Sequence, residues 1–451
     1  MSGLRRPRFE YELVYFYPPL QALHPTGSEE VYPRPIVGRG EPFQPSVYLH
    51  LPFCTGRCAY CHYASLARRL GDTSEVEDYL DALEQEILLL KRTLPFDNSQ
   101  IEAVHFGGGT PTFLSPDQIR RVMDGLCTQI RTGSAAEITW ESSPETLLDD
   151  RGSRIDALLQ SRVNRLNVGV QSFEASLLKV IGRRHTAVEA IRAFELAREK
   201  GFANINIDLI YGLPDQTLVQ WEHTLDIVGD LRPESVTVYH LRIKRGTRIA
   251  RLERSRFVSE DQCLQMGAMM LQKLEGFGYH AWQPNQFALE EPYVHRYLKS
   301  KWEAPVEVVG IGLSAYSFVD NWTYVNYRTL PEYYGAIRSG RLPIFLGKQL
   351  SCDQQMAKAV VLGIKLLPDG VSTSRFCERF GVSLDQVYGP TIARLQEAGL
   401  VELTETCLRL TRPSGLLLAD EVCVEFYAEE DSQRLREVGA TRYGSYLDAL
   451  P

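Results

Sequence analysis

Three of the nine cysteines crowd into eight residues, at Cys54, Cys58 and Cys61, while the other six are widely spaced. Cysteine thiolate is the soft ligand that iron–sulfur clusters use. Three such ligands leave one iron of a [4Fe–4S] cluster without a protein partner and open to a substrate. Zinc is the alternative, with His62 as a fourth ligand, but zinc ligands usually come as two separated pairs and no second pair follows. The segment therefore predicts a [4Fe–4S] site with one open iron.

A glycine-rich turn and an acid follow the next two β-rich runs. The turn reads Phe106-Gly107-Gly108-Gly109-Thr110-Pro111. Glycines allow a backbone to approach a ligand where any Cβ would collide. Taken alone, however, a glycine-rich turn is equally consistent with a tight turn that binds no ligand. Glu141 ends the following run, where a carboxylate is either solvated surface or a ligand contact.

Three further polar residues lie in or after the later β-rich runs. Gln171 offers both a donor and an acceptor, and Arg183 offers a fork that fits a carboxylate. Taken alone, Arg183 reads as a surface arginine at a helix end. Asp208 is a lone acid in an otherwise apolar run, which is costly unless it has a partner, so its position favours a functional role.

These groups need a scaffold that brings them together. From residue 47 onward, short β-rich runs alternate with helix-length amphipathic stretches, a rhythm that predicts parallel βα units and an α/β fold. Such a series fits an open or partial barrel whose working groups sit at the carboxyl ends of the strands. The predicted strands are Val47–Leu51, Ile101–Phe106, Glu137–Trp140, Arg165–Val170, Asn204–Ile210 and Ser235–Leu241, and the predicted helices include Ser74–Lys91, Ser115–Ile130, Ala187–Lys200 and Leu218–Gly229.

We expect four segments along the chain. Residues 1–45, rich in Pro, Arg and Tyr, form an N-terminal extension, and residues 46–345 form the barrel, with a further strand over Val309–Tyr316. Residues 346–415 are predicted to form a winged-helix-like domain without a basic recognition face, and so a packing or lid domain. Its expected elements are helices over Gln354–Leu366, Arg375–Phe380 and Leu384–Ala398 and a hairpin over Val401–Leu410. Residues 416–451 form a C-terminal tail.

The composition of the chain excludes several classes of protein. The 451 residues carry a net charge of −8, which argues against a sequence-independent grip on nucleic acid. No apolar run approaches the roughly 20 residues that a membrane helix needs, and the N-terminus lacks a hydrophobic signal core. An odd number of cysteines argues against a secreted disulfide framework. We therefore expect a soluble, cytoplasmic protein with no membrane or nucleic-acid partner.

The cysteine pattern C-x3-C-x2-C, with the aromatic Tyr60 before its last cysteine and a predicted strand before its first, resembles that of radical S-adenosylmethionine (SAM) enzymes. Over roughly residues 45–415 the chain is similar to their HemN-like group. The resemblance implies a partial (β/α)6 TIM-like barrel of the radical SAM type, with a C-terminal winged-helix-like HemN domain. It also implies that Cys54, Cys58 and Cys61 hold a [4Fe–4S] cluster.

The resemblance further implies two bound SAM molecules. The one at the cluster would be held by Gly108, Gly109, Thr110 and Glu141, which match the GGGTP and E-x-x-P motifs of the group. The second would be held by Gln171, Arg183 and Asp208. Other cofactor positions of the group fall on Tyr48, Tyr60, Tyr239, Gly310 and Gly312.

Members of the HemN-like group differ around the cluster. The oxygen-independent coproporphyrinogen III dehydrogenases have a further cysteine two residues after the last cluster cysteine, where this chain has Tyr63. The haem chaperone HemW has Cys-Asp-Phe where this chain has Cys61-His62-Tyr63, and a histidine–asparagine element where it has His295-Arg296. The long N-terminal extension and His62 suit the class C methylases better.

We therefore expect a class C radical SAM methylase or cyclopropanase that transfers a one-carbon unit to an unsaturated natural-product intermediate. The alternatives are the coproporphyrinogen dehydrogenase and the haem chaperone. A proton must move late in the methylase reaction, and the expected residues are His62, Tyr60 and Tyr239. The expected partners are a small-molecule acceptor, a flavodoxin- or ferredoxin-type reductant and a partner methyltransferase.

Overall fold

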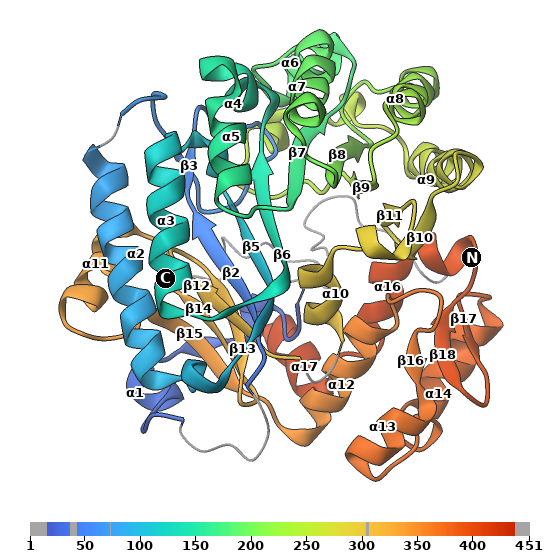
Figure 1. Cartoon of the computed structure of the whole chain (residues 1–451). Coiled ribbons are helices and arrows are strands. Elements are labelled where there is room, and N and C mark those ends of the chain that lie inside the picture. The colour runs from blue at the N-terminus through green and yellow to red at the C-terminus, as the bar shows by residue number, and fades with distance from the viewer. Residues whose placement is uncertain (1–15, 37–42, 73, 304–305, 438–451) are drawn as a thin grey trace.

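The computed structural model describes residues 16–36, 43–72, 74–303 and 306–437. Within these ranges one thirteen-stranded sheet curves through the molecule, with helices on its outer face (Figure 1). Its centre is the predicted run of six parallel strands, paired in chain order. These strands are β2 (Ser46–Leu51), β5 (Ile101–Gly108), β6 (Thr132–Ser142), β7 (Arg165–Gln171), β8 (Ile205–Tyr211) and β9 (Ser235–His240).

Helices connect the parallel strands, as parallel pairing requires. Their sequences carry clear start signals: Thr186 and Glu189 cap each other at the start of α7, and Ser115 and Gln118 do so at α3. Apolar residues at helical spacing then face the sheet. The connecting helices are α2 (Ser74–Thr93), α3 (Pro116–Gln129), α4 (Pro144–Leu148), α5 (Ser153–Gln160), α6 (Ala175–Ile181), α7 (Ala187–Lys200), α8 (Leu218–Leu231) and α9 (Glu260–Gly276).

Additional strands extend the barrel sheet on both sides. Beyond β2 lie the parallel strand β12 (Val308–Ile311) and then the antiparallel strands β13 (Tyr316–Val319), β14 (Trp322–Asn326), β15 (Ile344–Gln349) and β1 (His24–Pro25). Beyond β9 lie β11 (Gln286–Ala288) and β10 (His280–Gln283), and the short pair β3 (Phe53–Cys54) and β4 (Leu66–Ala67) stands apart. The single strand expected over Val309–Tyr316 is wrong, because the chain turns at Gly312, where φ is +99°.

Helix α10 (Arg296–Trp302) packs against the concave face of the sheet instead of its outer face. Tyr48 and His50 alternate with apolar residues on β2 and so point to this concave face. His295, at the start of α10, contacts the inward-facing His105 and Thr139 of β5 and β6. The helix therefore covers part of the barrel interior (Figure 1).

The C-terminal region has the predicted order of three helices and a hairpin. The helices are α12 (Cys352–Gly363), α13 (Thr373–Phe380) and α14 (Leu384–Glu397), and the hairpin is β17 (Val401–Leu403) and β18 (Cys407–Leu410), joined by β16 (Val371–Ser372). This confirms the winged-helix-like order. The chain continues through α15 (Ser414–Leu417), α16 (Ala419–Val424) and α17 (Glu429–Glu437). The part of the predicted tail at 438–451 lies outside the described residues.

The described part of the N-terminal segment is built into the fold. Residues 1–15 and 37–42 of the expected extension lie outside the described ranges. Tyr17 is fully buried, and its hydroxyl donates to Asp431 of α17, while β1 pairs with β15 and is followed by α1 (Ser28–Val31). A further helix, α11 (Leu330–Arg338), covers the sheet beside α2. In the described ranges no helix is both long and apolar enough to cross a membrane.

Candidate functional site

The three clustered cysteines lie in the segment that follows β2, with Cys54 at the end of the short strand β3, and the glycine-rich turn packs directly against this segment. The backbone N–H of Gly109 donates to the carbonyl of Leu51 at 2.8 Å, and the Thr110 hydroxyl donates to Cys54 Sγ at 3.6 Å. A Cβ on Gly109 would lie 2.6 Å from the carbonyl oxygen of Phe53, so only glycine fits there. The structure thus brings the two predicted motifs together.

Arg183 joins the cysteine loop to the barrel. Its guanidinium donates to Cys58 Sγ at 3.5 Å and to the carbonyl oxygen of Gly169 on β7. Its buried Nε has no hydrogen-bond partner among the described residues. Arg183 was predicted beside the second SAM molecule, and the structure places it between that region and the cluster loop.

Two of the three clustered thiols are buried strongly enough to change their acidity. Burial raises the pKa of Cys54 to about 12 and also raises the pKa of Cys61, and the neighbouring cysteines raise both further. Buried thiolates of this kind need a metal cation to be stable. No three His, Cys, Asp or Glu side chains of the described chain gather closely enough to hold one metal ion. Each cysteine of a [4Fe–4S] cluster binds a different iron, and these three cysteines lie on one short segment of the chain.

Glu141 ends β6 with both carboxylate oxygens oriented by the protein. Oε2 accepts from the backbone N–H of Gly108 at 3.2 Å, and Oε1 lies 3.0 Å from His105 Nε2. His105 Nδ1 lies 3.3 Å from His295 Nε2, and His295 also contacts Thr139 at 3.2 Å. The Glu141 side chain keeps 36% of its surface exposed, so its remaining lone pairs face a ligand that could bind beside Gly108.

The sequence analysis missed the role of His105, although one signal was present. His105 stands two residues before Gly107 on a strand, and residues two apart point to the same face. His295 was noted only as part of a haem-site element. The contact between them joins residues 190 positions apart, which no local pattern reveals.

The residues predicted for the second SAM molecule meet on β7 and β8. Asp208 pairs in register with Gly169, whose carbonyl contacts Arg183, and Gln171 ends the same strand in a left-handed conformation with φ +71°. Asp208 accepts a hydrogen bond from Asn206 at 2.7 Å. Burial and the charge of Glu141 raise the pKa of Asp208 to about 7. This acid is therefore half protonated near neutral pH.

The proposed proton-transfer residues lie in different surroundings. Tyr60 and Tyr239 both pack against one small apolar cluster that includes Ile181, and burial with the charge of Cys58 raises the pKa of Tyr60. Burial and the charges of Lys244, Arg328 and Arg57 lower the pKa of His62 to about 3, so its imidazole is neutral at pH 7. Tyr60 and His62 thus lie on the cluster loop itself, and their role in proton transfer stays a prediction, as does that of Tyr239.

Tyr63 is a residue of the site that the sequence analysis did not select. Its ring stacks on His62 at 4.6 Å, and 52% of its surface is exposed. Its pKa is nevertheless raised by burial and by the charges of Glu141, Cys61 and Asp208. Tyr63 is therefore an exposed aromatic side chain within electrostatic range of Glu141 and Asp208.

Tyr48 lies on β2, Gly310 lies on the adjoining strand β12, and Gly312 lies in the turn just after β12. The Tyr48 hydroxyl lies 3.1 Å from His50 Nδ1 and its ring stacks on His105 at 5.8 Å. A Cβ on Gly310 would lie 2.3 Å from the carbonyl oxygen of Tyr316, and one on Gly312 would lie 2.5 Å from the Tyr79 hydroxyl. Packing within the protein thus accounts for both glycines, and their cofactor role stays a prediction.

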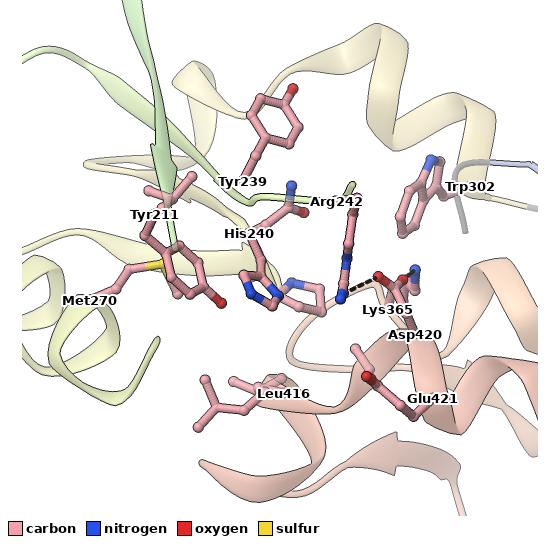
Figure 2. Close-up of a pocket in the computed structure, with 15 residues that line it drawn as sticks. Tyr211, Tyr239, His240, Arg242, Met270, Trp302, Lys365, Leu416, Asp420 and Glu421 are labelled. Atoms are coloured by element: carbon pink, nitrogen blue, oxygen red, sulfur yellow. Dashed lines mark hydrogen bonds and ion pairs between the residues drawn. The ribbon is translucent and has the colours of Figure 1, made fainter. Parts of the chain in front are cut away.

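A separate cavity of about 60 Å³ lies where the barrel meets the C-terminal region (Figure 2). Asp420 of α16 stands there between the ammonium of Lys365 and the guanidinium of Arg242, with an Arg242–Asp420 distance of 3.4 Å. His240 stacks on Tyr211 at 4.9 Å, while the ring of Tyr239 points away from the charged group (Figure 2). Tyr239 therefore forms part of the wall of this cavity and also packs in the apolar cluster that contains Tyr60.

Comparisons with known proteins agree with this architecture. Residues 48–228 match the family model described as "Radical SAM superfamily", and residues 350–418 match the one described as "HemN C-terminal domain". The haem chaperone HemW of Bacillus subtilis is 31% identical over 85% of this chain and 99% of its own length. The oxygen-independent coproporphyrinogen III oxidase of Pseudomonas aeruginosa is 29% identical over 84% of this chain and 85% of its own length. The structure of the Escherichia coli oxidase HemN superposes with a TM-score of 0.78 and 24% identity, over 94% of this chain and all of that chain.

These relatives overturn one expectation. The prediction of a class C methylase or cyclopropanase of a natural-product pathway is wrong, because the proteins that match the chain along its length are a haem chaperone and porphyrinogen oxidases. The N-terminal extension had suggested a methylase. Its described part instead has a structural task, since Tyr17 packs on α17 and β1 completes the sheet.

Proposed function

Because the chain belongs to the HemN-like family of radical SAM proteins, we propose that it handles a tetrapyrrole and acts as a HemW-like haem-binding protein. The observation that carries this proposal is the 31% identity to the Bacillus subtilis haem chaperone, which extends over 99% of that protein. The oxidase match leaves part of the oxidase without a counterpart, since it covers 85% of its length. The missing fourth cysteine after Cys61 favours the same choice.

Members of the radical SAM superfamily bind a [4Fe–4S] cluster and SAM, and residues of this chain fit both. We propose that Cys54, Cys58 and Cys61 hold the cluster and that Glu141, with the Gly108 backbone, holds SAM at its open iron. Bound there, the cluster would supply the electron for reductive cleavage of SAM. A flavodoxin- or ferredoxin-type protein is the proposed donor of that electron.

The group formed by Gln171, Arg183 and Asp208 is proposed to hold a second SAM molecule. Support comes from the register between β7 and β8, which puts Asp208 beside Gly169, and from the contact of Arg183 with Cys58. A second SAM molecule there would lie next to the first. Equilibrium dialysis at saturation counts the SAM molecules, and a single one per chain would contradict this part of the proposal.

The haem would lie on the concave face, where Glu141 and Asp208 are partly exposed. We do not assign its iron to His295, the histidine that this chain shares with the haem-site element. That side chain is 2% exposed and already contacts His105 and Thr139. Iron ligation by His295 would require α10 to leave the concave face.

Porphyrinogen oxidation is the second candidate function. Support for this candidate comes from the extent of the structural match, which covers the full length of the chain in the Escherichia coli oxidase structure. The two functions differ in a measurable product, since an oxidase releases carbon dioxide from a porphyrinogen and a chaperone releases nothing.

The test uses anaerobically reconstituted protein. We expect haem to bind with a saturable shift of its Soret band, and we expect no carbon dioxide from coproporphyrinogen III in the presence of SAM and a reductant. Replacing Cys54, Cys58 and Cys61 together by Ala should remove the iron–sulfur absorption and leave haem binding intact. The control is Cys352→Ala, at an exposed cysteine in the first turn of α12, which should keep the iron. Turnover of the porphyrinogen without haem binding would reject the chaperone in favour of the oxidase.

A further inference from the structure

A strongly basic stretch of the chain follows the last parallel strand, β9. Residues 242–256 contain seven cations and a single acid, Glu253, in a chain whose net charge is −8. The seven cations are Arg242, Lys244, Arg245, Arg248, Arg251, Arg254 and Arg256. Such a concentration of one sign of charge in an acidic chain needs a physical explanation.

This stretch packs directly against the segment that carries the three clustered cysteines. The backbone N–H of Ile249 donates to the carbonyl of Ala59 at 2.9 Å, and the Arg248 guanidinium donates to the carbonyl of Arg57. The backbone N–H of Ala59 in turn donates at 2.8 Å to the carbonyl of Ile181, which ends α6. The cysteine segment is therefore held between the end of α6 and the loop after β9.

Four exposed arginines, together called the arginine surface, lie around this segment: Arg57, Arg184, Arg248 and Arg251. Arg57 stands directly before Cys58 in the chain. The Arg184 guanidinium lies against Gly56, where a Cβ would be 2.8 Å from its Nε. Arg251 ends the short 3-10 turn that begins at Ile249. The positive charges thus meet where the cysteine segment reaches the solvent.

The arginine surface has no acidic partner in the described part of the chain. There its guanidinium groups form no ion pair, and their only hydrogen bond goes to the backbone carbonyl of Arg57. Nearby acids are engaged elsewhere: Asp215 pairs with Arg256 at 2.8 Å, and Glu145 accepts from Thr55 at 3.2 Å. A guanidinium has five N–H donors, so these groups keep most of their capacity for the carboxylates of a partner.

Local charge decides what can dock at this place. At physiological ionic strength the Debye length is about 8 Å, so a docked molecule senses the neighbouring arginines more than the net charge of the chain. Clustered charges of one sign speed the association of a partner of the opposite sign. Interfaces for electron transfer are small, so four arginines around one short segment suit such an encounter.

We propose that the arginine surface is the docking site for a small acidic electron-transfer protein of the flavodoxin or ferredoxin type. The inference rests on the proposed [4Fe–4S] cluster and adds the place where its reductant binds. A donor on this surface contacts Arg57, whose Cα is about 3.8 Å from that of Cys58, so it stands beside a cluster ligand. One electron leaves the reduced donor and is taken up at the cluster, and no bond forms or breaks.

The test compares two donors on anaerobically reconstituted full-length protein. Dithionite is a small reductant that needs no docking surface, and a photoreduced flavodoxin of strongly negative net charge is the protein donor. With Arg184→Glu and Arg251→Glu combined, bleaching of the iron–sulfur absorption by flavodoxin should be about 10-fold slower than in wild type at low salt. Reduction by dithionite should be unchanged. The difference should shrink as salt is added, because salt screens the docking charges.

The matched control combines Arg131→Glu and Arg375→Glu, which changes the net charge by the same amount. Both arginines are exposed, and neither side chain has an acidic partner among the described residues. Arg131 directly precedes β6, at the opposite end of the barrel strands, and Arg375 lies on α13, far from α6 in Figure 1. Both donors should reduce this control at wild-type rates, and its iron content should equal that of the test variant.

A second readout does not depend on the cluster. Binding of oxidised flavodoxin to the full-length protein, measured by isothermal titration at low salt, should weaken about 10-fold in the test variant and stay unchanged in the control. Flavodoxin binding at these arginines by a protein that takes up no iron would support the docking surface and reject the cluster. Equal rates of reduction by flavodoxin in wild type and test variant would overturn the inference, as would binding of a single-stranded RNA oligomer to the arginine surface in place of flavodoxin.

Discussion

At the scale of single residues, the site contains an acid that opposes folding. The pKa of Asp208 is about 7 in the folded chain against an ordinary value of 3.8, because burial and Glu141 disfavour its ionised form. The unfolded chain therefore loses this proton at lower pH than the folded chain does. Below about pH 4 Asp208 is protonated in both states and does not lower the free energy of unfolding. As the pH rises from about 4 to about 7, the free energy of unfolding falls by about 4 kcal/mol in total, because the unfolded chain ionises first.

Asp208→Asn should therefore stabilise the protein more at pH 8 than at pH 5. The amide oxygen of Asn still accepts from Asn206, so the main change is the loss of charge. The gain at pH 8 should exceed that at pH 5 by about 3 kcal/mol, measured by urea unfolding at the two pH values. Asp230→Asn, at an exposed acid on α8, is the control and should show no such difference. An equal effect of Asp208→Asn at both pH values would contradict the raised pKa.

Local sequence was enough to select Cys54, Gly109 and Glu141, which stand at or just after the ends of β-rich runs, and Asp208, which is a lone acid inside an apolar run. The structure brings these residues to one end of the barrel. Tyr63 and His105 were missed for a different reason. Their surroundings depend on which side chains of distant strands face them, and a single strand pattern gives the face but not the neighbours.

At the scale of elements, the tight approach of β12 to β13 depends on a glycine. A Cβ at Gly310 would lie 2.3 Å from the backbone carbonyl of Tyr316, which no side-chain movement can relieve. Gly310→Ala should therefore push the two strands apart and destabilise the protein by about 3 kcal/mol. Gly335→Ala on α11 is the matched control, since its Cβ would meet nothing within 4 Å and alanine favours a helix by up to about 1 kcal/mol. Thermal unfolding of the two variants should shift in opposite directions, and a shift in the same direction would contradict the strand-contact account.

The six parallel strands were predicted to within a few residues, except that β6 begins at Thr132 and not at Glu137. Their β-rich runs lie between helices with strong capping residues, so the local sequence is enough to predict where each strand lies. The position of α10 was not predictable in the same way. Its sequence forms a helix, but its place on the concave face depends on His295 and Ser300 meeting His105 and Ser46 across the fold.

At the scale of the whole molecule, the barrel and the C-terminal region meet around Asp420. Lys365 is 3% exposed, and Arg242 is also largely buried, so removal of the acid leaves two buried cations without their common partner. Asp420→Ala should cost about 3–5 kcal/mol of stability. The control is Glu402→Ala, which breaks an exposed pair with Arg409 and should cost less than about 1 kcal/mol. Urea unfolding gives both values, and equal costs would mean that Asp420 does not join the two parts.

The chain of contacts behind Glu141 also fixes where its hydrogens are. Because a carboxylate oxygen only accepts, His105 Nε2 carries a hydrogen in its contact with Glu141, and in the singly protonated ring Nδ1 then accepts from His295 Nε2. Burial and the charge of Arg165 lower the pKa of His295, so His295 stays neutral. A second proton on His105 would set two N–H groups against each other. The series of donors therefore points one way, toward the barrel interior, and Glu141 presents only acceptors there, which selects ligands that arrive with an ammonium or a hydroxyl group.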